Sequence, residues 1–471
     1  MEASKGFQAP AAGTAHRPSG TCRVRAWKLL FAAGLLHALL AAVLQALGWA
    51  GVAPTLVGPT GFSPVLAHDA AAFQFHASYL VWTLREQGLA AWVAVPAQLH
   101  AKLYSLSYAV LAPLCGYGTL GAEPLNILYY LATLVLLFQL GQQVGGPRAG
   151  LVAAAAVALW PSYLLLSVQI LRDPLFIVAL LLLCRCGVAL VVGPRRAAGG
   201  LGLGLAGGLA VWVLWLVRWD FQEVVAGAAL LAAVLAALGR QGAGRSGARL
   251  GAVLLVAMTL GAPRLAEATR PLGLFPRQSP GLAVAPLGPV VATHCDPATP
   301  LSCLHDLVER LAWRAGYLRQ KFLHKYGRTG SAIDADVVLE GSGELVRYLP
   351  RALCIGLLAP FPHHWLEPGG RAGRAGRLLS AVEMLLLYAV YPLAVLALVQ
   401  RPRAPAVYLG LVALAGCMAL GAVVLNLGTL YRLRYAFCML FVVLGSSAQL
   451  PVRLRLAGAL SAACSRIRSA R

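Results

Sequence analysis

Long apolar stretches constrain this chain more than any other feature. Residues 149–168 form one of several stretches of about 20 residues that contain no charged side chain, and a helix of that length crosses a hydrocarbon core of about 30 Å. Only 12% of the 471 residues are charged, whereas soluble domains carry about 25%. The sequence therefore predicts an all-α polytopic membrane protein. It does not favour a β-barrel, which needs short segments of alternating hydrophobicity.

Hydrophobicity predicts about ten transmembrane helices. They cover residues 27–50, 123–143, 149–168, 172–192, 199–217, 222–239, 250–264, 376–399, 406–425 and 434–449. Short basic turns, such as those at Arg148, Arg196 and Arg401, separate them, and basic tails flank them. Because Lys and Arg prefer cytoplasmic loops, topology explains the net charge of +22 better than nucleic-acid binding does.

The first span determines the predicted orientation. Its apolar run is too long for a signal peptide and lacks a small-residue cleavage signal, so we expect an uncleaved span. We expect a multi-pass protein of the cell inner (plasma) membrane with both termini in the cytoplasm. Residues 103–115 and 353–361 are apolar but short, and counting either one alone as a span would invert every later span. We expect both to stay at the interface. Arg371, Arg374 and Arg377 then fall outside, which is the one exception to the charge rule.

This topology divides the chain into five regions. A cytoplasmic basic tail (1–26) precedes an N-terminal transmembrane module (27–264), whose first outer loop spans 51–122 and carries interfacial helices. An extracytoplasmic loop region (265–375), C-terminal transmembrane helices (376–450) and a second cytoplasmic basic tail (451–471) follow. Cys295 and Cys303 share the large outer loop, where a disulfide and two free thiols are equally compatible with their spacing.

The large outer loop contains one predicted amphipathic helix. Its apolar residues are Leu304, Leu307, Val308, Leu311, Leu318 and Phe322, and its basic residues on other faces are Arg310, Arg314, Arg319, Lys321 and Lys325. Two interpretations stay open. The helix lies on the membrane against anionic headgroups, or it packs on the rest of the loop.

Acidic residues near the spans are the first candidates for chemistry, because an ionisable group at membrane depth is costly. They are Asp69, Glu86, Glu123, Asp173, Asp220, Glu223 and Glu383. Asp69 follows the first span, and its alternative role is that of a solvated loop acid. Asp173 precedes Pro174 at the start of the fourth span, so its alternative role is a helix cap paired with Arg172. The predicted topology places Asp69 and Asp173 on the same side, as a shared site requires.

Two arginines flanked by tyrosines, Arg432 and Arg434, lie at the outer end of the last predicted span. Arginine binds phosphate through two parallel hydrogen bonds, so this motif favours a lipid phosphate. Ordinary anchoring at the membrane interface is the alternative.

Four features together resemble the GT-C superfamily of membrane glycosyltransferases. They are an acid in the first outer loop, an Arg-Asp in the second, the turn GQQVGGPRAG and the closing GTLYRLRY. The closest likeness is to the bacterial branch related to protein O-mannosyltransferases and the aminoarabinose transferase of lipid A. The resemblance covers residues 27–240, weakens through the large loop and returns at the C-terminal spans. It implies a cell-envelope enzyme, as in polysaccharide biosynthesis, that moves a hexosyl or pentosyl group from a polyprenyl-phosphate donor to a lipid, glycan or protein acceptor at the extracytoplasmic face, with inversion.

The resemblance also implies roles for individual residues. Asp69 would be the general base and Asp173 would orient the acceptor or support Asp69. Arg432, Arg434 and Arg218 would bind the donor phosphate, with Arg172, Asp220 and His68 in support. Many relatives carry a paired Asp-Glu in the first loop, whereas here His68 precedes Asp69 and Ala70 follows it. We therefore expect no metal and no cofactor. The expected partners are membrane lipid, the polyprenyl-phosphate-linked sugar donor and an unidentified acceptor, with no nucleic acid.

A transporter or flippase of lipid-linked glycans is the alternative of a different class. Such proteins show repeated halves and broken helices that meet near mid-membrane, and the sequence shows neither clearly. A third hypothesis is a catalytically inactive relative that binds a lipid-linked glycan or a partner protein.

Overall fold

The computed structural model describes residues 20–52, 68–194, 196–239, 246–274, 300–326, 332–366 and 373–449. Nearly all of these residues are helical. The helices of the first half are α1 (Gly20–Trp49), α3 (His68–Glu86), α4 (Gly88–Ala94), α5 (Leu99–Cys115), α6 (Thr119–Gly145), α7 (Pro147–Ala158), α8 (Pro161–Ser167), α9 (Asp173–Val192), α10 (Ala197–Arg218) and α11 (Gln222–Leu238). Those of the second half are α12 (Ser246–Ala268), α13 (Pro300–Tyr326), α14 (Ser342–Leu358), α15 (Gly373–Gln400), α16 (Ala404–Val423), α17 (Leu427–Leu433) and α18 (Tyr435–Ser446). Three short 3-10 turns are η1 (Trp219–Phe221), η2 (Arg270–Leu272) and η3 (Pro362–His364).

In the described part of the chain, 7 helical stretches are long and apolar enough to cross a membrane, or up to 9 if each of two bent helix pairs is one span. The chain is therefore an all-α, multi-span membrane protein. The longest stretch, Ala197–Leu238, contains η1 between α10 and α11. α10 and α12 run parallel, with Gly200 against Gly247 and Gly204 against Gly251, so α11 between them must run in the opposite direction. The expected number of ten spans stays a prediction.

One predicted span, residues 149–168, is broken rather than continuous, and a second bend lies at the start of the last predicted span, residues 434–449. α7 and α8 are bent by 69° at a break that ends at Pro161, and α17 and α18 are bent by 51° around Arg434. Proline at the first turn of α8 fits this break, because its ring cannot continue the preceding helix but suits a helix start. The sequence does not show broken helices clearly, and the structure contains two such bent pairs.

α14 contains most of the second short apolar stretch, residues 353–361. Gly356 lies against the backbone of Cys417, and Gly421 of α16 lies against Ala352, so the two helices pack closely and antiparallel. The last turn of α14 is thus level with the middle of α16. α14 therefore enters the bundle from one end and stops part-way along it.

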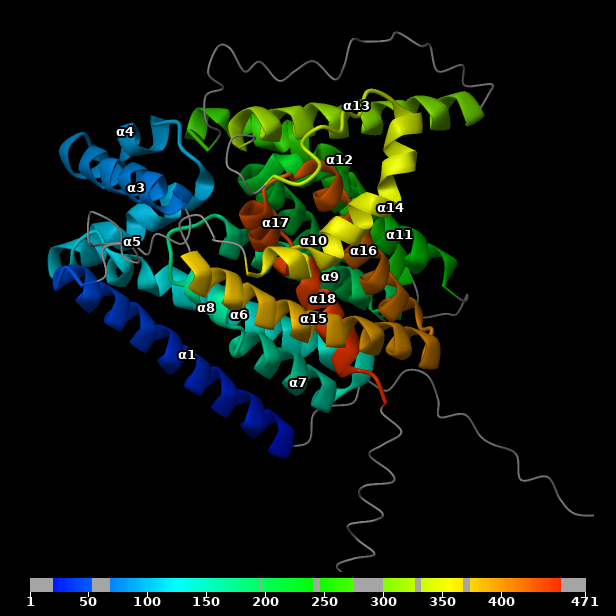
Figure 1. Cartoon of the computed structure of the whole chain (residues 1–471), viewed down its shortest axis with the longest axis horizontal. Helices are drawn as coiled ribbons and strands as arrows, with labels where there is room; N and C mark the ends of the chain where they lie inside the picture. Colours follow the sequence, from blue (N-terminus) through cyan, green and yellow to red (C-terminus); the bar gives the residue numbers. More distant parts are fainter. Residues whose placement is uncertain are drawn as a thin grey trace, which may run out of the picture.

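Helices α3, α4 and α5 lie together at one end of the bundle, and α13 lies across the same end (Figure 1). We call this the site end. The Lys102 side chain links α5 to α4 and to η2, because its Nζ donates to the carbonyl oxygens of Val93 at 2.7 Å and of Leu272 at 2.8 Å. Burial lowers the pKa of Lys102 below its ordinary value. The helices of the first outer loop, α4 and α5, are thus connected to the end of α12 through η2.

The predicted amphipathic helix is confirmed as α13, but its faces differ from the expected ones. Leu307 and Leu311 are exposed, whereas Arg319 is buried and donates to the carbonyl oxygens of Val337 at 3.0 Å and Ala422 at 2.9 Å. At Arg319, α13 therefore packs on the loop residue Val337 and on the end of α16. The prediction for Cys295 and Cys303 concerns side chains outside the described part of the chain.

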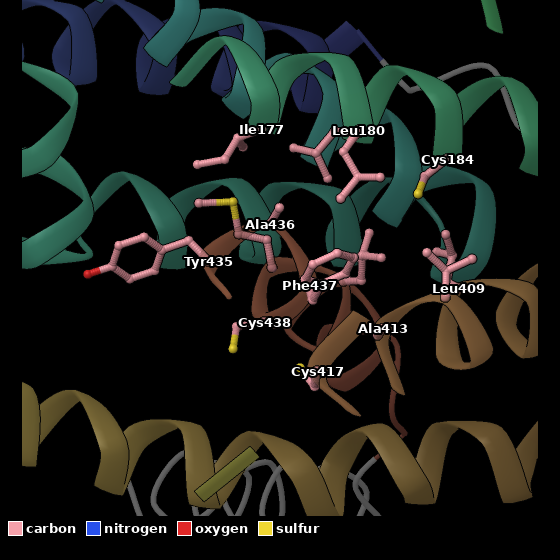
Figure 2. Packing of buried hydrophobic residues seen from close by; sticks show 14 of the residues in the cluster. Ile177, Leu180, Cys184, Leu409, Ala413, Cys417, Tyr435, Ala436, Phe437 and Cys438 are labelled. Atoms are coloured by element: carbon pink, nitrogen blue, oxygen red, sulfur yellow. The ribbon is translucent and has the colours of Figure 1, made fainter. Parts of the chain in front are cut away.

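The apolar core beneath the site end is formed by α9, α16 and α18. Figure 2 shows the buried side chains Ile177, Leu180, Cys184, Leu409, Ala413, Cys417, Ala436, Phe437 and Cys438 meeting there. The Phe437 ring fills the space beside Gly416, where a Cβ would lie 2.2 Å from the ring. This close packing holds the start of α18 and the first half of α9 in fixed positions. It therefore also restrains Arg432, just before α18, and Asp173, at the start of α9.

Candidate functional site

Arg432 joins two of the predicted site acids. Its Nη2 donates to Asp69 Oδ2 at 3.0 Å, and its Nε lies 2.9 Å from Asp173 Oδ2. The Asp69 side chain is 25% exposed and that of Arg432 is 13% exposed, whereas that of Asp173 is only 7% exposed. Asp69 and Arg432 are therefore the members of this group that a ligand can reach most easily.

Asp173 is held from its other side by Arg218, which donates to Asp173 Oδ1. Arg218 is buried in the last turn of α10, and Asp173 lies in the first turn of α9. The side chain of Asp173 makes no capping hydrogen bond, and its ion-pair partners are Arg218 and Arg432 rather than Arg172. The alternative interpretation of Asp173 as a cap paired with Arg172 was wrong.

Four helices position these charges. Asp69 lies in the first turn of α3, and not in an irregular loop as its alternative role supposed. Arg432 lies near the end of α17, whose start is capped by Asn426 Oδ1, which accepts from the Thr429 N–H at 3.0 Å. The structure thus brings Asp69, Asp173, Arg218 and Arg432 to one place, which we call the Asp69–Arg432 cluster.

Two of the three predicted supporting residues, Arg172 and Asp220, lie near this cluster without an ion pair to it among the described contacts. Arg172 precedes α9 and is close enough to Arg218, Asp220, Asp173 and Arg432 to interact electrostatically with them. Burial, reinforced by the nearby guanidinium of Arg218, lowers the pKa of Arg172 to about 10, so it stays protonated at neutral pH. Asp220 lies in η1, and the side chain of His68 is outside the described residues.

Arg434 does not belong to the cluster. Its guanidinium is buried, and it donates to the carbonyl oxygen of Ala359, to those of Gly356 at 3.4 Å and Leu357 at 3.5 Å, and to Met384 Sδ at 2.7 Å. These carbonyls lie at the end of α14, where acceptors have no intrahelical partner, and a buried cation suits that end of a helix. Arg434 therefore joins α14 to the break between α17 and α18, and it is not placed to bind a donor phosphate.

His100 is a buried neighbour of the cluster that sequence reasoning missed. It lies in the first turn of α5, and neither ring nitrogen has a hydrogen-bond partner. Its ring contacts Phe73 edge-on at 4.4 Å between centroids, and Phe73 lies one turn after Asp69 on α3. Burial lowers the pKa of His100 to about 3, and Arg172 adds to the shift, so the ring is neutral at neutral pH.

A second polar group lies behind Arg432. Glu383 of α15 is buried, and its carboxylate accepts hydrogen bonds from the Ser162 N–H at 2.8 Å, the Ser162 hydroxyl and the Tyr431 hydroxyl. The Ser162 and Tyr435 hydroxyl oxygens are 2.5 Å apart. The signal for Glu383 was an acid within an apolar span. Its partners could not be predicted, because they come from two helix breaks far apart in the sequence.

Two further polar contacts lie within the bundle. His37 of α1 contacts Glu123 Oε1 at 2.7 Å and the Ser167 hydroxyl at 3.0 Å. Arg185 of α9 donates from Nε to Gln139 Oε1 at 3.2 Å. These contacts pair polar side chains of neighbouring helices and are separate from the Asp69–Arg432 cluster.

The chemistry available to the cluster follows from its composition. Among the described residues, no group of three or more His, Cys, Asp and Glu side chains is arranged to hold a metal ion. Arginine offers paired donors that match phosphate oxygens, and a carboxylate beside it can accept a proton. An anionic ligand at Arg432 has to compete with Asp69, because both would use the same guanidinium.

Comparison with known proteins adds no family to this description. No protein-family model matches the chain, and no curated protein is similar enough to count as a match. The class of protein is thus defined by its fold, a multi-span helical membrane protein with a charged cluster at one end of the bundle.

Proposed function

We propose that this protein is a membrane glycosyltransferase that moves a sugar from a polyprenyl-phosphate donor to an acceptor hydroxyl. The observation that carries the proposal is the contact of Arg432 with both Asp69 and Asp173 at the site end. One reachable carboxylate and one reachable guanidinium are the two groups that this transfer needs. The resemblance of the first outer loop and the closing GTLYRLRY to GT-C enzymes supports the same assignment.

The proposed step is a single inverting displacement. The acceptor oxygen attacks the anomeric carbon of the sugar while Asp69 takes the hydroxyl proton. The bond between the anomeric carbon and the phosphate oxygen breaks, and polyprenyl phosphate leaves with the bonding electrons. Arg432 stabilises the charge on the departing phosphate, and a positioned base contributes typically 10²–10⁴-fold to such a rate.

The two contacts of Arg432 suggest how the donor prepares the base. A donor phosphate that binds Nη2 displaces the carboxylate of Asp69, while Nε keeps its contact with the buried Asp173. Asp69 then loses its contact with the Arg432 guanidinium and becomes a stronger proton acceptor, because a nearby cation favours the charged carboxylate. Arg218 lies deeper and holds Asp173, so we assign it to the support of Asp173 rather than to the phosphate.

The test uses purified protein and labelled polyprenyl-phosphate sugars. Asp69→Asn is expected to lower transfer at least 100-fold while donor binding persists, since the amide cannot act as the base. Glu267→Gln is the matched control, because Glu267 is an exposed acid paired with Arg270 at the end of α12. Full activity in Asp69→Asn overturns the assignment of the base.

Transport of a lipid-linked glycan is the second candidate, and the two broken helix pairs favour it. Discontinuous helices in transporters place their termini at the substrate. The two functions separate in reconstituted vesicles. A transporter moves a labelled glycolipid between leaflets without changing it, whereas a transferase consumes the donor and releases polyprenyl phosphate.

A further inference from the structure

The short helix that carries Arg432 is anchored at three points. Asn426 caps its start, Arg434 ties its end to α14, and the Tyr431 hydroxyl donates to Glu383 on α15. α17 contains only 7 residues, so it has little hydrogen bonding of its own to hold it in place. Its position therefore depends on these side-chain contacts together with the core packing of the buried Leu427, Leu430 and Leu433.

Tyr431 and Arg432 are consecutive, so their side chains leave α17 about 100° apart. Tyr431 contacts Glu383 on α15, whereas Arg432 contacts Asp69 on α3 and Asp173 on α9. Because a helix turns as one unit, fixing the direction of Tyr431 also fixes the direction of Arg432. The contact with Glu383 thus acts on the direction of Arg432 as well as on that of Tyr431.

Glu383 also holds the other helix break. Its carboxylate accepts the Ser162 N–H, one of the donors left open at the start of α8, so a single buried group joins α8, α15 and α17. A buried carboxylate is a costly way to join helices, because apolar side chains of similar volume pack at lower cost. Its distinctive property is that one acceptor group can orient two hydroxyl donors at once.

We infer that Glu383, acting through Tyr431, is the positioning residue for Arg432. Glu383 touches neither donor nor acceptor. Its role is to hold α17 so that the guanidinium of Arg432 meets Asp69 and the donor phosphate at the correct angle. The inference rests on the proposed function for its effect on catalysis, but the geometric coupling between Tyr431 and Arg432 is independent of that function.

Tyr431→Phe is the sharpest substitution, since it removes only the hydroxyl that contacts Glu383. A hydrogen bond to a charged group justifies an expected rise of about tenfold in the KM for the donor, with a smaller change in kcat. Tyr435→Phe is the matched control, because it removes a neighbouring hydroxyl that contacts Ser162 and not Glu383. We expect Glu383→Gln to behave like Tyr431→Phe. Equal effects in Tyr431→Phe and Tyr435→Phe would contradict a specific role for the Glu383 contact.

A coupling measurement separates this inference from the proposed function. The Asp69–Arg432 interaction is measured by a double-mutant cycle on unfolding in detergent, with Asp69→Ala and Arg432→Ala, first in the natural sequence and then in Tyr431→Phe. We expect the coupling to fall by at least half in Tyr431→Phe and to persist in Tyr435→Phe. Unchanged coupling in Tyr431→Phe overturns the positioning role. Lost coupling in a protein that transfers no sugar leaves the positioning role standing and rejects the transferase.

Discussion

The guanidinium of Arg432 lies 3.0 Å from the carboxylate of Asp69, although 363 residues separate them in the chain. The same guanidinium reaches Asp173 at 2.9 Å through a different nitrogen. One arginine thus joins the start of α3, the start of α9 and the end of α17. A ligand that binds this guanidinium would therefore change the electrostatic surroundings of both carboxylates.

Arg432→Lys tests whether the two contacts need a guanidinium. Lysine keeps the charge but presents one compact donor group, so it cannot satisfy Asp173 and a phosphate as arginine does. We expect polyprenyl phosphate to bind at least tenfold more weakly to Arg432→Lys, and more weakly still to Arg432→Ala. Isothermal titration in detergent measures the affinity. Arg351→Lys is the matched control, since Arg351 pairs with Asp334 at an exposed position. Unchanged affinity in Arg432→Lys would assign the tyrosine-flanked motif to anchoring.

Arg218 and Asp173 form the most buried ion pair of the cluster, and this predicts a large effect on stability. Arg218→Ala leaves the buried carboxylate of Asp173 with one cation fewer, and such a loss costs about 3–5 kcal/mol. The double variant Arg218→Met, Asp173→Leu is expected to recover part of that loss, because both charges of this pair are removed while Arg172 and Arg432 lose Asp173 as a neighbouring anion. Arg270→Ala breaks the exposed pair with Glu267 and should cost under about 1 kcal/mol. Chemical unfolding in detergent measures all three variants, and equal losses for Arg218→Ala and Arg270→Ala would contradict the prediction.

His100 predicts a loss of stability on mild acidification. Its pKa is about 3 in the folded protein and about 6.5 in an unfolded chain. Between these values the unfolded state binds a proton that the folded state does not, so stability falls as the pH is lowered below 6.5. One such group contributes at most about 1.4 kcal/mol per pH unit. The slope between pH 6.5 and 5 is compared in the natural sequence and in His100→Gln, with His76→Gln as the control for its titratable neighbour. Identical slopes in the natural sequence and His100→Gln would show that another group carries the effect.

Most of the membrane-spanning helices were predictable from the sequence, because length and the absence of charge determine which segments can cross a membrane. The faces of α13 were not, since Arg319 is buried while Leu307 and Leu311 are exposed. Pro161 signalled the break between α7 and α8, but a proline within an apolar stretch is also compatible with a kink. For Asp69 and Asp173 the sequence predicted only that both lie on the same side of the membrane. The number of spans determines on which side a helix end lies, and it does not determine which helices are neighbours. Their common partner Arg432 depends on how α17 is turned.

The burial of Arg434 against the end of α14 shows why the rest of the site could not be predicted. Arg432 and Arg434 have the same local sequence context, with a tyrosine on one side and a leucine on the other. Arg434 is buried because α14 ends beside it and presents open carbonyls, and nothing in the YRLRY motif encodes that contact. Similarly, His100 becomes a neighbour of the cluster only because α5 packs on α3. Long-range packing therefore decided which polar residues form the cluster.

The two ends of the bundle should face different compartments, and cysteine labelling can establish which. Arg148, Arg196 and Arg403 lie at the ends of helices away from the cluster, whereas Glu267 lies at the end of α12 beside the α3–α5 layer. Because basic turns favour the cytoplasm, Glu267→Cys is expected to react with an impermeant maleimide in intact cells, and Arg403→Cys only after the membrane is opened. Both positions are exposed, so access to the side chain does not limit either reaction. The natural sequence, which keeps its exposed Cys354, supplies the background signal. Labelling of Arg403→Cys alone in intact cells would place the Asp69–Arg432 cluster on the cytoplasmic side, where its donor would have to be presented from the inner leaflet.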